Sequence, residues 1–390
     1  MLLENNRKKD TIIFEQIYIK KELATMSLTK VKTLVRENKI VRVVLFLIVA
    51  ALLFVYLNRV FTIGNSDSNK QIFNGFYAQE EETIDVMYLG TSATNRYFIP
   101  PKAYNDEGIE AFDLATMGLP MFFVPNLIDE VEKTQSPQLY IIELRNVLKT
   151  KNDITDAHIR RVTDSMPASV NKYEALDKAL KYTEGATGER SNIDESYVDY
   201  LIPIVKYHSR FSAGEITPED FKPWTVKNTT KGYVLSDLTL QQKPYEPPVY
   251  SDGFQDLAPE MEEALIEVLD RCDKLDADVM FVFSPFAMRK DVQAKFNTAI
   301  KIVEERGYTV LDCNQKAVTD EMGIDWEHDL YNSKHVNFAG AEKYTDYLVK
   351  YLKENYDLPD RREDAKWDSW AEAYEEYLDF TSKGLNDPEE

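Results

Sequence analysis

Two short segments of the sequence carry residue types that could perform nucleophilic chemistry together. Ser92 ends the run Leu-Gly-Thr-Ser after an apolar segment, and His335 lies in a polar loop before the last strongly helical segment. A serine hydroxyl becomes a nucleophile when an imidazole within hydrogen-bond reach takes its proton. We therefore interpret Ser92 and His335 as a candidate nucleophile and general base. Taken singly, they have plainer interpretations, as an N-capping serine and a satisfied surface or core histidine.

The residues around Ser92 narrow the kind of site that it could form. Gly90 permits a tight turn after the apolar run, and the amides at the start of the following helix could stabilise an oxyanion. Thr94 stands where a G-x-S-x-G nucleophile elbow would have its second glycine. The sequence therefore predicts a serine at the end of a strand, but not the elbow of an α/β-hydrolase.

The elements that would position these residues alternate between strands and helices. Short apolar runs predict five strands, at residues 85–89, 111–115, 139–144, 278–284 and 309–312. Helical patterns between and after them predict helices at residues 121–133, 257–275, 288–306 and 338–355. Strands separated by helices are typical of crossover connections, so we predict an α/β domain: three α/β/α layers around a mainly parallel sheet.

Residues 150–255 interrupt this alternation. Helical patches at residues 155–165, 171–182 and 194–206 are followed by a mostly irregular stretch that contains several prolines and glycines. We interpret the whole stretch as an insertion or lid. In an open α/β sheet the ligand lies at the carboxyl ends of the strands, which is where Ser92 falls.

The blocks that contain Ser92 and His335 resemble those of the SGNH (GDSL-like) hydrolase superfamily. The likeness is closer to its membrane-anchored bacterial branch, which is related to the D-alanyl transfer proteins of teichoic acid and to polysaccharide O-acetylation proteins. It rests on Asp-Val-Met-Tyr-Leu-Gly-Thr-Ser, ending at Ser92, and on Asp-Leu-Tyr-Asn-Ser-Lys-His-Val-Asn-Phe-Ala-Gly-Ala-Glu-Lys-Tyr, around His335. It spans roughly residues 83–357 and implies an SGNH- or flavodoxin-like fold.

Further residues acquire a role only through this resemblance. The block Phe-Asp-Leu-Ala-Thr-Met-Gly that ends at Gly118 is similar to the one that carries the oxyanion-hole glycine. The family also uses an asparagine there, for which Asn146 is our candidate and Asn95 the substitute. Tyr-His-Ser-Arg, which includes His208 and Arg210, resembles a middle motif of the anchored branch, so both side chains are candidates to line the site.

The sequence departs from the family at the residue that should orient the histidine. The family has an aspartate three residues before it, whereas this chain has Asn332 three residues before His335. An asparagine can accept a hydrogen bond from Nδ1–H but brings no charge to stabilise an imidazolium. We favour Asp329, the nearest carboxylate, as the orienting group and keep Asn332 as the alternative.

One segment is apolar enough to cross a membrane. Every residue from Val43 to Leu57 is apolar or tyrosine, and residues 40–61 reach the ~20 residues that a bilayer needs. A core helix would have a polar face, and a cleaved signal peptide would have a small-residue site after the run. Basic residues precede the span, so we expect residues 1–39 to be a cytoplasmic arm and the rest to be extracytoplasmic at the plasma membrane.

Beyond the span, we expect residues 62–82 to be a polar stalk, residues 83–357 the main domain and residues 358–390 an acidic appendage. Trp367, Trp370, Tyr374 and Tyr377 in this appendage could dock an amphipathic helix on the domain or form a carbohydrate-stacking surface. We favour docking.

The composition excludes some classes of function. A net charge of −21 argues against nucleic-acid binding, which needs clustered Lys and Arg. Cys272 and Cys313 are the only cysteines, and we interpret them as buried free thiols in a helix and a strand. They give no support for a thiolate metal site, and we expect neither a metal nor a cofactor.

Two functions remain open. The first is a membrane-anchored serine esterase or O-acyltransferase that acts on a cell-envelope polysaccharide or a teichoic-acid-like polymer. The second is a non-catalytic accessory protein of the same fold, which binds such a polymer or a membrane-bound O-acyltransferase. The pair of Ser92 and His335 favours the first, and Asn332 favours the second. We prefer the first.

Overall fold

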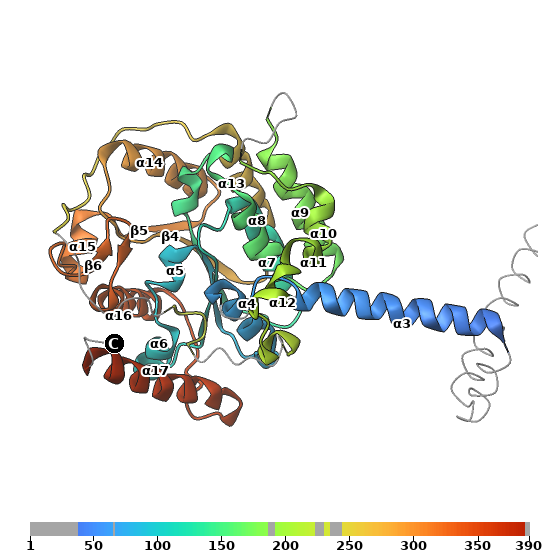
Figure 1. The fold of residues 1–390 in the computed structure, drawn as a ribbon. Helices are drawn as coiled ribbons and strands as arrows, with labels where there is room; N and C mark the ends of the chain where they lie inside the picture. The colour runs from blue at the N-terminus through green and yellow to red at the C-terminus, as the bar shows by residue number, and fades with distance from the viewer. Residues whose placement is uncertain (1–37, 65–66, 186–191, 223–229, 235–243, 387–390) are drawn as a thin grey trace, which may run out of the picture. The chain divides into compact units, whose positions relative to one another are not determined.

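The computed structural model describes residues 38–64, 67–185, 192–222, 230–234 and 244–386, and it divides the chain into two units, residues 1–60 and 61–390 (Figure 1). Of the predicted basic arm, residues 1–37 lie outside the described residues.

The first unit contains one long apolar helix, α3 (Lys39–Val60). Its most apolar 18-residue window has a mean hydropathy of 2.9, and none of that window is buried. Large side chains such as Phe46, 71% exposed, therefore face outward along the helix. A helix of this length and composition can cross a membrane, in agreement with the span predicted at residues 40–61.

The second unit is built on a five-stranded sheet in which every neighbouring pair is parallel. Its strands are β1 (Val86–Gly90), β2 (Ala111–Ala115), β3 (Leu139–Glu143), β4 (Asp278–Phe283) and β5 (Thr309–Asp312). Their spatial order is β2-β1-β3-β4-β5. The five predicted strands and the parallel α/β class are confirmed, because each apolar run was long enough to be buried on both faces of the sheet.

Helices cover both faces of this sheet. Alternate residues of β1 belong to two separate cores: Met87 and Leu89 lie in one, and Val86 and Tyr88 in the other. The first core is completed by α4 (Ser68–Ala78), α7 (Val124–Val131), α9 (Val170–Thr183), α13 (Pro259–Cys272) and α14 (Lys290–Glu305). The second is completed by α6 (Pro100–Glu107), α15 (Lys316–Met322), α16 (Phe338–Asn355) and α17 (Asp368–Asn386). The fold is thus three-layered, as predicted.

The predicted stalk at residues 62–82 is wrong for its larger part. It contains α4, whose side chains Ile72, Phe73 and Phe76 are fully buried in the first core. The helix begins at Asp67, whose carboxylate accepts hydrogen bonds from two backbone amides of the first turn. The buried face of this helix consists of a few apolar residues at helical spacing among many polar ones. The segment therefore looked polar in the sequence and was interpreted as a stalk.

The insertion is helical in its first part, whereas its described residues 244–255 have no regular secondary structure, in agreement with the irregular stretch predicted there. Its helices are α8 (Asp156–Thr163), α9, α10 (Tyr197–Leu201), α11 (Pro203–Tyr207) and α12 (Ser209–Ala213). The single helix predicted at residues 194–206 breaks after Leu201, because a residue that precedes a proline disfavours the helical conformation.

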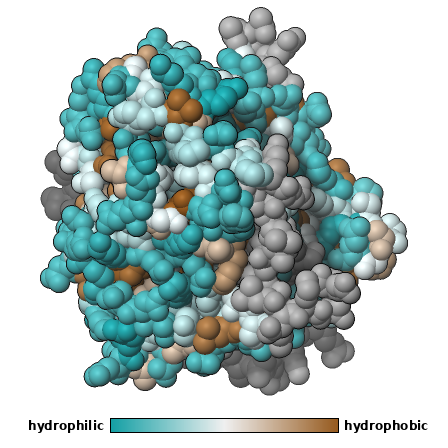
Figure 2. Space-filling model, turned by 90° about the vertical axis from the view of Figure 1, so that its left-hand side faces the viewer, coloured by the Kyte–Doolittle hydropathy of each residue, from teal (hydrophilic) through white to brown (hydrophobic). Residues whose placement is uncertain are grey.

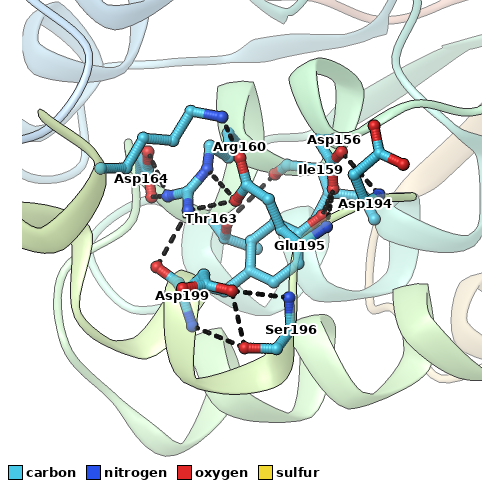
Figure 3. A network of polar contacts seen from close by, with 11 residues as sticks. Asp156, Ile159, Arg160, Thr163, Asp164, Asp194, Glu195, Ser196 and Asp199 are labelled. Atoms are coloured by element: carbon cyan, nitrogen blue, oxygen red, sulfur yellow. Dashed lines mark hydrogen bonds and ion pairs between the residues drawn. The ribbon is translucent and has the colours of Figure 1, made fainter. Parts of the chain in front are cut away.

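A buried arginine ties the insertion together (Figure 3). The guanidinium of Arg160 in α8 forms ion pairs with Asp164 and Glu195, and it donates to the carbonyl of Asp199 in α10 at 2.9 Å. Asp156 adds a link, because it accepts from the Tyr200 hydroxyl. Segments about 40 residues apart in the sequence are joined by these contacts.

The C-terminal appendage docks on the domain, as favoured. Trp367 donates its indole N–H to the carbonyl of Thr83 at 3.0 Å, and Trp370 donates to that of Ala111 at 3.1 Å. Trp370 is completely buried. Docking rather than a stacking surface therefore explains both tryptophans.

The expected state of the cysteines is also confirmed, since Cys272 and Cys313 are buried free thiols. The coloured part of the face shown in Figure 2 is mostly hydrophilic, with hydrophobic residues scattered in small spots. Helix α3, in contrast, carries its apolar residues outward.

Candidate active site

The strand order places a topological switch point between β1 and β3. The connection that follows β1 leads to β2 on one side, and the connection that follows β3 leads to β4 on the other side, so the loops after β1 and β3 diverge. In open α/β sheets the ligand site lies at such a point, beyond the carboxyl ends of the strands. Ser92 follows β1, and Arg145 and Asn146 follow β3.

Ser92 is free to act as something other than a helix cap. The short helix α5 (Ser92–Asn95) is capped by Thr91, whose hydroxyl accepts from the Ala93 amide at 3.0 Å. Gly90 is required just before it, since a Cβ there would lie 2.2 Å from the Thr94 hydroxyl and 2.6 Å from Cβ of Glu143. The plainer N-cap interpretation of Ser92 is therefore wrong.

Ser92 and His335 form a hydrogen-bonded pair. The Ser92 hydroxyl lies 2.8 Å from His335 Nε2, although 243 residues separate them in the sequence. His335 is carried by a small antiparallel hairpin, β6 (Leu330–Asn332) and β7 (His335–Val336), which leads directly into α16. The structure thus brings together the two residues that the sequence singled out.

Asn332 fixes the proton positions in this pair. Its Oδ1 accepts from the backbone amide of Lys334 at 2.8 Å and lies 3.1 Å from His335 Nδ1. Because the oxygen can only accept, Nδ1 must carry the ring proton. Nε2 is then unprotonated and accepts from the hydroxyl of Ser92. This is the tautomer that a general base requires.

Asp329, which we expected to orient His335, is used elsewhere. Its carboxylate accepts from Lys343 and from the backbone amide of Asp325, each at 2.6 Å. It is buried and paired with the Lys343 ammonium. The β6–β7 hairpin does not curl back as that expectation required, because only two residues, Ser333 and Lys334, separate its strands. Asn332 therefore holds the orienting position.

An arginine that the sequence analysis missed holds this hairpin. The guanidinium of Arg145 donates to the Lys334 carbonyl at 2.5 Å and to the hydroxyls of Tyr97 and Ser284 at 3.2 Å. Tyr97 itself donates to the Lys334 carbonyl at 2.9 Å. Both groups therefore fix the backbone next to His335. The available signal was position, since Arg145 directly precedes the candidate Asn146 after the third strand.

Glu143 lies beneath this arginine at the end of β3. It is buried, and its carboxyl accepts from the Ser284 hydroxyl at 2.7 Å and from the Arg145 amide at 3.0 Å. Burial raises its pKa to about 7, against the opposing effects of Arg145 and Ser284. Near neutral pH this carboxyl is therefore only partly charged.

The surroundings of His335 oppose its protonation. Its pKa is lowered to about 3, first because the ring is buried and then because Arg145, Arg96 and Lys334 are positively charged. The imidazole is thus neutral at physiological pH, the state in which it can take a proton. The same charges make the imidazolium that would result costly.

The Gly118 loop is oriented by neighbouring side chains. Gly118 has a φ of +71°, and a Cβ there would lie 2.6 Å from His158. Arg161 donates to the Met117 carbonyl at 3.1 Å, and Asn69 of α4 accepts from the Met117 amide at 2.7 Å. Since the carbonyl and the following N–H of a trans peptide point in opposite directions, the Gly118 amide points away from Arg161.

A lysine supports the same loop. Lys149 donates to the Gly118 carbonyl at 3.1 Å, and its pKa is lowered to about 8, mainly by burial and also by Arg161 and Lys334. Burial, Lys149 and Arg161 also lower the pKa of His158, to about 4. Lys334 thus acts electrostatically on both His335 and the Gly118 loop.

The two candidate asparagines differ in what they offer. Both side chains are buried. In Asn146 the buried atom without a partner among the described residues is the donor Nδ2, whereas in Asn95 it is the acceptor Oδ1. Only a donor can stabilise an oxyanion, so this difference favours Asn146.

His208 and Arg210 are engaged outside the Ser92–His335 pair. His208 is exposed, and its Nδ1 lies 2.7 Å from the Val205 carbonyl. Arg210 is buried, forms an ion pair with Asp220 at 2.9 Å, and donates to the carbonyl of Thr62 at 2.8 Å. These contacts give Arg210 a structural role, in which it holds the chain around Thr62.

Within the described part of the chain, no group of three or more His, Cys, Asp or Glu side chains could hold a metal ion. Comparison with known proteins assigns no family, because no family model and no curated protein matches the chain. The class that the fold defines is an α/β domain with a five-stranded parallel sheet, preceded by a long apolar helix.

Proposed function

We propose that this protein is a membrane-anchored serine esterase or O-acyltransferase of the SGNH type. One observation carries the proposal: the Ser92 hydroxyl lies 2.8 Å from His335 Nε2, and the other ring nitrogen, Nδ1, lies 3.1 Å from Oδ1 of Asn332. A nucleophile, a base and an orienting group in this order are the arrangement that activates a serine. Their place at the switch point of the sheet supports it.

The steps follow from this geometry. His335 Nε2 takes the hydroxyl proton while Ser92 Oγ attacks the carbonyl carbon of an ester. The oxyanion receives hydrogen bonds from the amides of Ser92 and Gly118 and from Asn146 Nδ2. The ester bond then breaks, and the imidazolium gives its proton to the leaving alcohol. Water, or a hydroxyl of the acceptor, loses a proton to His335 and attacks the carbonyl carbon of the acyl-enzyme. The bond from this carbon to Ser92 Oγ breaks, and the imidazolium returns its proton to Oγ, which regenerates Ser92 and releases the acid or the acylated acceptor.

The proposed location is the outer face of the plasma membrane. Helix α3 would be the anchor, with the basic residues 1–39 in the cytoplasm and residues 61–390 facing the cell-envelope polymer. Single cysteines test this orientation, because Cys272 and Cys313 are buried. A Lys316→Cys variant should react with a membrane-impermeant maleimide in intact cells, and Ser27→Cys only after lysis. The reverse pattern would contradict the orientation.

A second candidate is a non-catalytic accessory protein that binds a polymer or a membrane-bound O-acyltransferase. The observation that favours it is Asn332, which orients His335 without supplying a charge. The missing charge lowers the rate of a serine–histidine pair by orders of magnitude without removing the pair.

Hydrolysis of p-nitrophenyl acetate by the full-length chain in detergent micelles separates the two candidates. We expect turnover that falls by about a thousandfold in Ser92→Ala and in His335→Ala. Ser333→Ala is the matched control, since this serine is exposed and next to the site. Activity that both substitutions leave unchanged in folded protein would rule out the catalytic proposal, and no activity would favour the accessory role.

A further inference from the structure

The charges that act on His335 are all of one sign. Three cations, Arg96, Arg145 and Lys334, lower its pKa, and no carboxylate of the described residues is among the groups that shift it. They come from three different elements: the end of α5, the loop after β3 and the turn of the β6–β7 hairpin. We name these three residues the cation face.

This arrangement is unexpected for the chain as a whole. The sequence has 67 Asp and Glu against 46 Lys and Arg, so an average cation has a surplus of carboxylates around it. Yet no ion pair joins a residue of the cation face to a carboxylate of the described residues. Charges that serve the fold are normally paired when they are buried in part.

Two carboxyl groups next to the β6–β7 hairpin and to Arg145, those of Asp329 and Glu143, are engaged with other partners. Asp329 is neutralised by the Lys343 ammonium. Glu143 accepts from Ser284 and from the Arg145 backbone, and its raised pKa leaves it partly protonated at neutral pH. Neither group therefore supplies His335 with a full negative charge.

Among the described residues, the groups that accept hydrogen bonds from the Arg145 guanidinium are neutral. Its partners are the hydroxyls of Tyr97 and Ser284 and the carbonyl of Lys334, and its guanidinium lies 4.2 Å from the ring centroid of Phe286. Hydrogen bonds to neutral acceptors orient a cation but leave its charge intact. Arg96 is half-buried and Lys334 exposed, so both can be reached from solvent.

We propose that the cation face binds an anionic group of the acyl acceptor, a phosphate or a carboxylate, and that this bound charge fills the role that Asn332 cannot. The proposal rests on the proposed function. When Ser92 passes its proton to His335 Nε2, the site gains an imidazolium beside three cations. A bound anion would offset them, and opposite charges at about 4–6 Å stabilise a charged group by one to three pKa units.

This mechanism links catalysis to the presence of the correct acceptor. With no anion, the neutral imidazole is a weak base and the acyl-enzyme forms slowly. When an anionic acceptor is bound, proton transfer from Ser92 becomes easier and the acceptor hydroxyl is held near the acyl group. Hydrolysis without an acceptor would therefore be limited, which suits a transferase.

The test uses the full-length chain in micelles and the neutral ester p-nitrophenyl acetate. Inorganic phosphate and acetate are titrated separately at pH 7 and constant ionic strength. We expect a saturable stimulation of about tenfold, from the lower end of the shift expected for a nearby opposite charge. The more effective of the two anions identifies the chemistry of the natural group. Ser92→Ala with the same anions corrects for hydrolysis by the buffer.

Variants of the cation face sharpen this experiment. Arg96→Gln and Lys334→Gln should raise the rate without an anion severalfold, because they remove repulsion of the imidazolium, and should reduce the stimulation. Lys316→Gln is the matched control, since this lysine is exposed and paired with Asp320. It should change neither quantity. Activity that requires Ser92 but does not respond to either anion would overturn the proposal.

Binding is measured independently of activity. Phosphate or acetate that binds the folded chain should raise its thermal unfolding midpoint, and Lys334→Gln should remove the increase. If the anion binds but no turnover is detected, the catalytic proposal fails and the anion site stands. If turnover depends on Ser92 but no anion binds, this proposal fails and the catalytic one stands.

Discussion

Two arginines of this protein, Arg160 in the insertion and Arg145 beside His335, have contacts of different charge. Arg160 is 1% exposed and forms ion pairs with Asp164 and Glu195 (Figure 3). Arg145 binds two hydroxyls and a carbonyl, with no ion pair to a carboxylate of the described chain. The pairing of Arg160 is what a buried charge needs for stability, since an unpaired one is costly.

The difference teaches how the same residue type serves the fold in one place and a site in another. Around Arg160 the charges cancel, so the network fixes the insertion and offers nothing to a ligand. Around Arg145 the charge remains, and it acts on His335. An uncompensated charge close to a nucleophile and a base is typical of functional sites.

The largest change in stability is expected when the ion pairs of Arg160 are broken. Arg160→Met leaves Asp164 buried without its partner, so the free energy of unfolding should fall by about 3–5 kcal/mol. Chemical denaturation measures this change. The double variant Arg160→Met/Asp164→Leu removes both charges and should recover part of the loss. A loss below about 1 kcal/mol for the single variant would show that the ion pairs do not hold the insertion.

The second prediction concerns Glu143, next to Arg145, and its effect on the pH dependence of the protein's stability. The pKa of Glu143 is raised from 4.5 to about 7 by burial, so the folded state binds this proton more tightly than the unfolded state. This tighter proton binding stabilises the folded state by up to about 3 kcal/mol. The stabilisation is fully present below about pH 4.5 and is lost as the pH rises to about 7.

Denaturation at pH 5 and pH 8 tests this contribution in Glu143→Gln. The amide stays neutral, so the variant should lose less stability than the wild type between these pH values. An identical loss in both proteins would show that Glu143 is not the group that titrates.

The third prediction tests whether a negative charge at position 332 would increase catalysis by His335. Asn332→Asp places a carboxylate beside Nδ1 of His335, where it can stabilise the imidazolium. Turnover of p-nitrophenyl acetate at pH 7 should rise about tenfold, and the stimulation by phosphate should become smaller. Asn332→Ala, which removes the acceptor altogether, should lower turnover. A folded Asn332→Asp protein with an unchanged rate would show that charge compensation at His335 does not limit the reaction.

The smallest effect is expected where a charge is paired but exposed. Lys316 and Asp320 form an ion pair with both side chains more than half exposed. Lys316→Gln should change the free energy of unfolding by less than about 0.5 kcal/mol, because solvent screens the pair. A change above 1 kcal/mol would mean that pairing alone, rather than burial, explains the importance of Arg160.

Much of this architecture follows from the sequence by itself. The apolar runs identified the five strands of the parallel sheet, but not the β6–β7 hairpin, since a parallel strand covered on both faces must be apolar along its whole length. The same argument identified α3, in which every residue from Val43 to Leu57 is apolar or tyrosine. Ser92 and His335 were recognisable because few residue types can act as a nucleophile and a base, and both lie in loops at the ends of predicted elements.

Other features were decided only by the tertiary structure. Helix α4 resembled a stalk, because three buried apolar residues are a weak signal until the core that receives them is known. The sequence favoured Asp329 on charge, but Lys343, fourteen residues further on, engages it and leaves the position to Asn332. Arg145 acquired its role from contacts 48 to 189 residues away. Local patterns determine which segments are strands and helices, whereas the partner of a polar side chain depends on which loops the fold brings together.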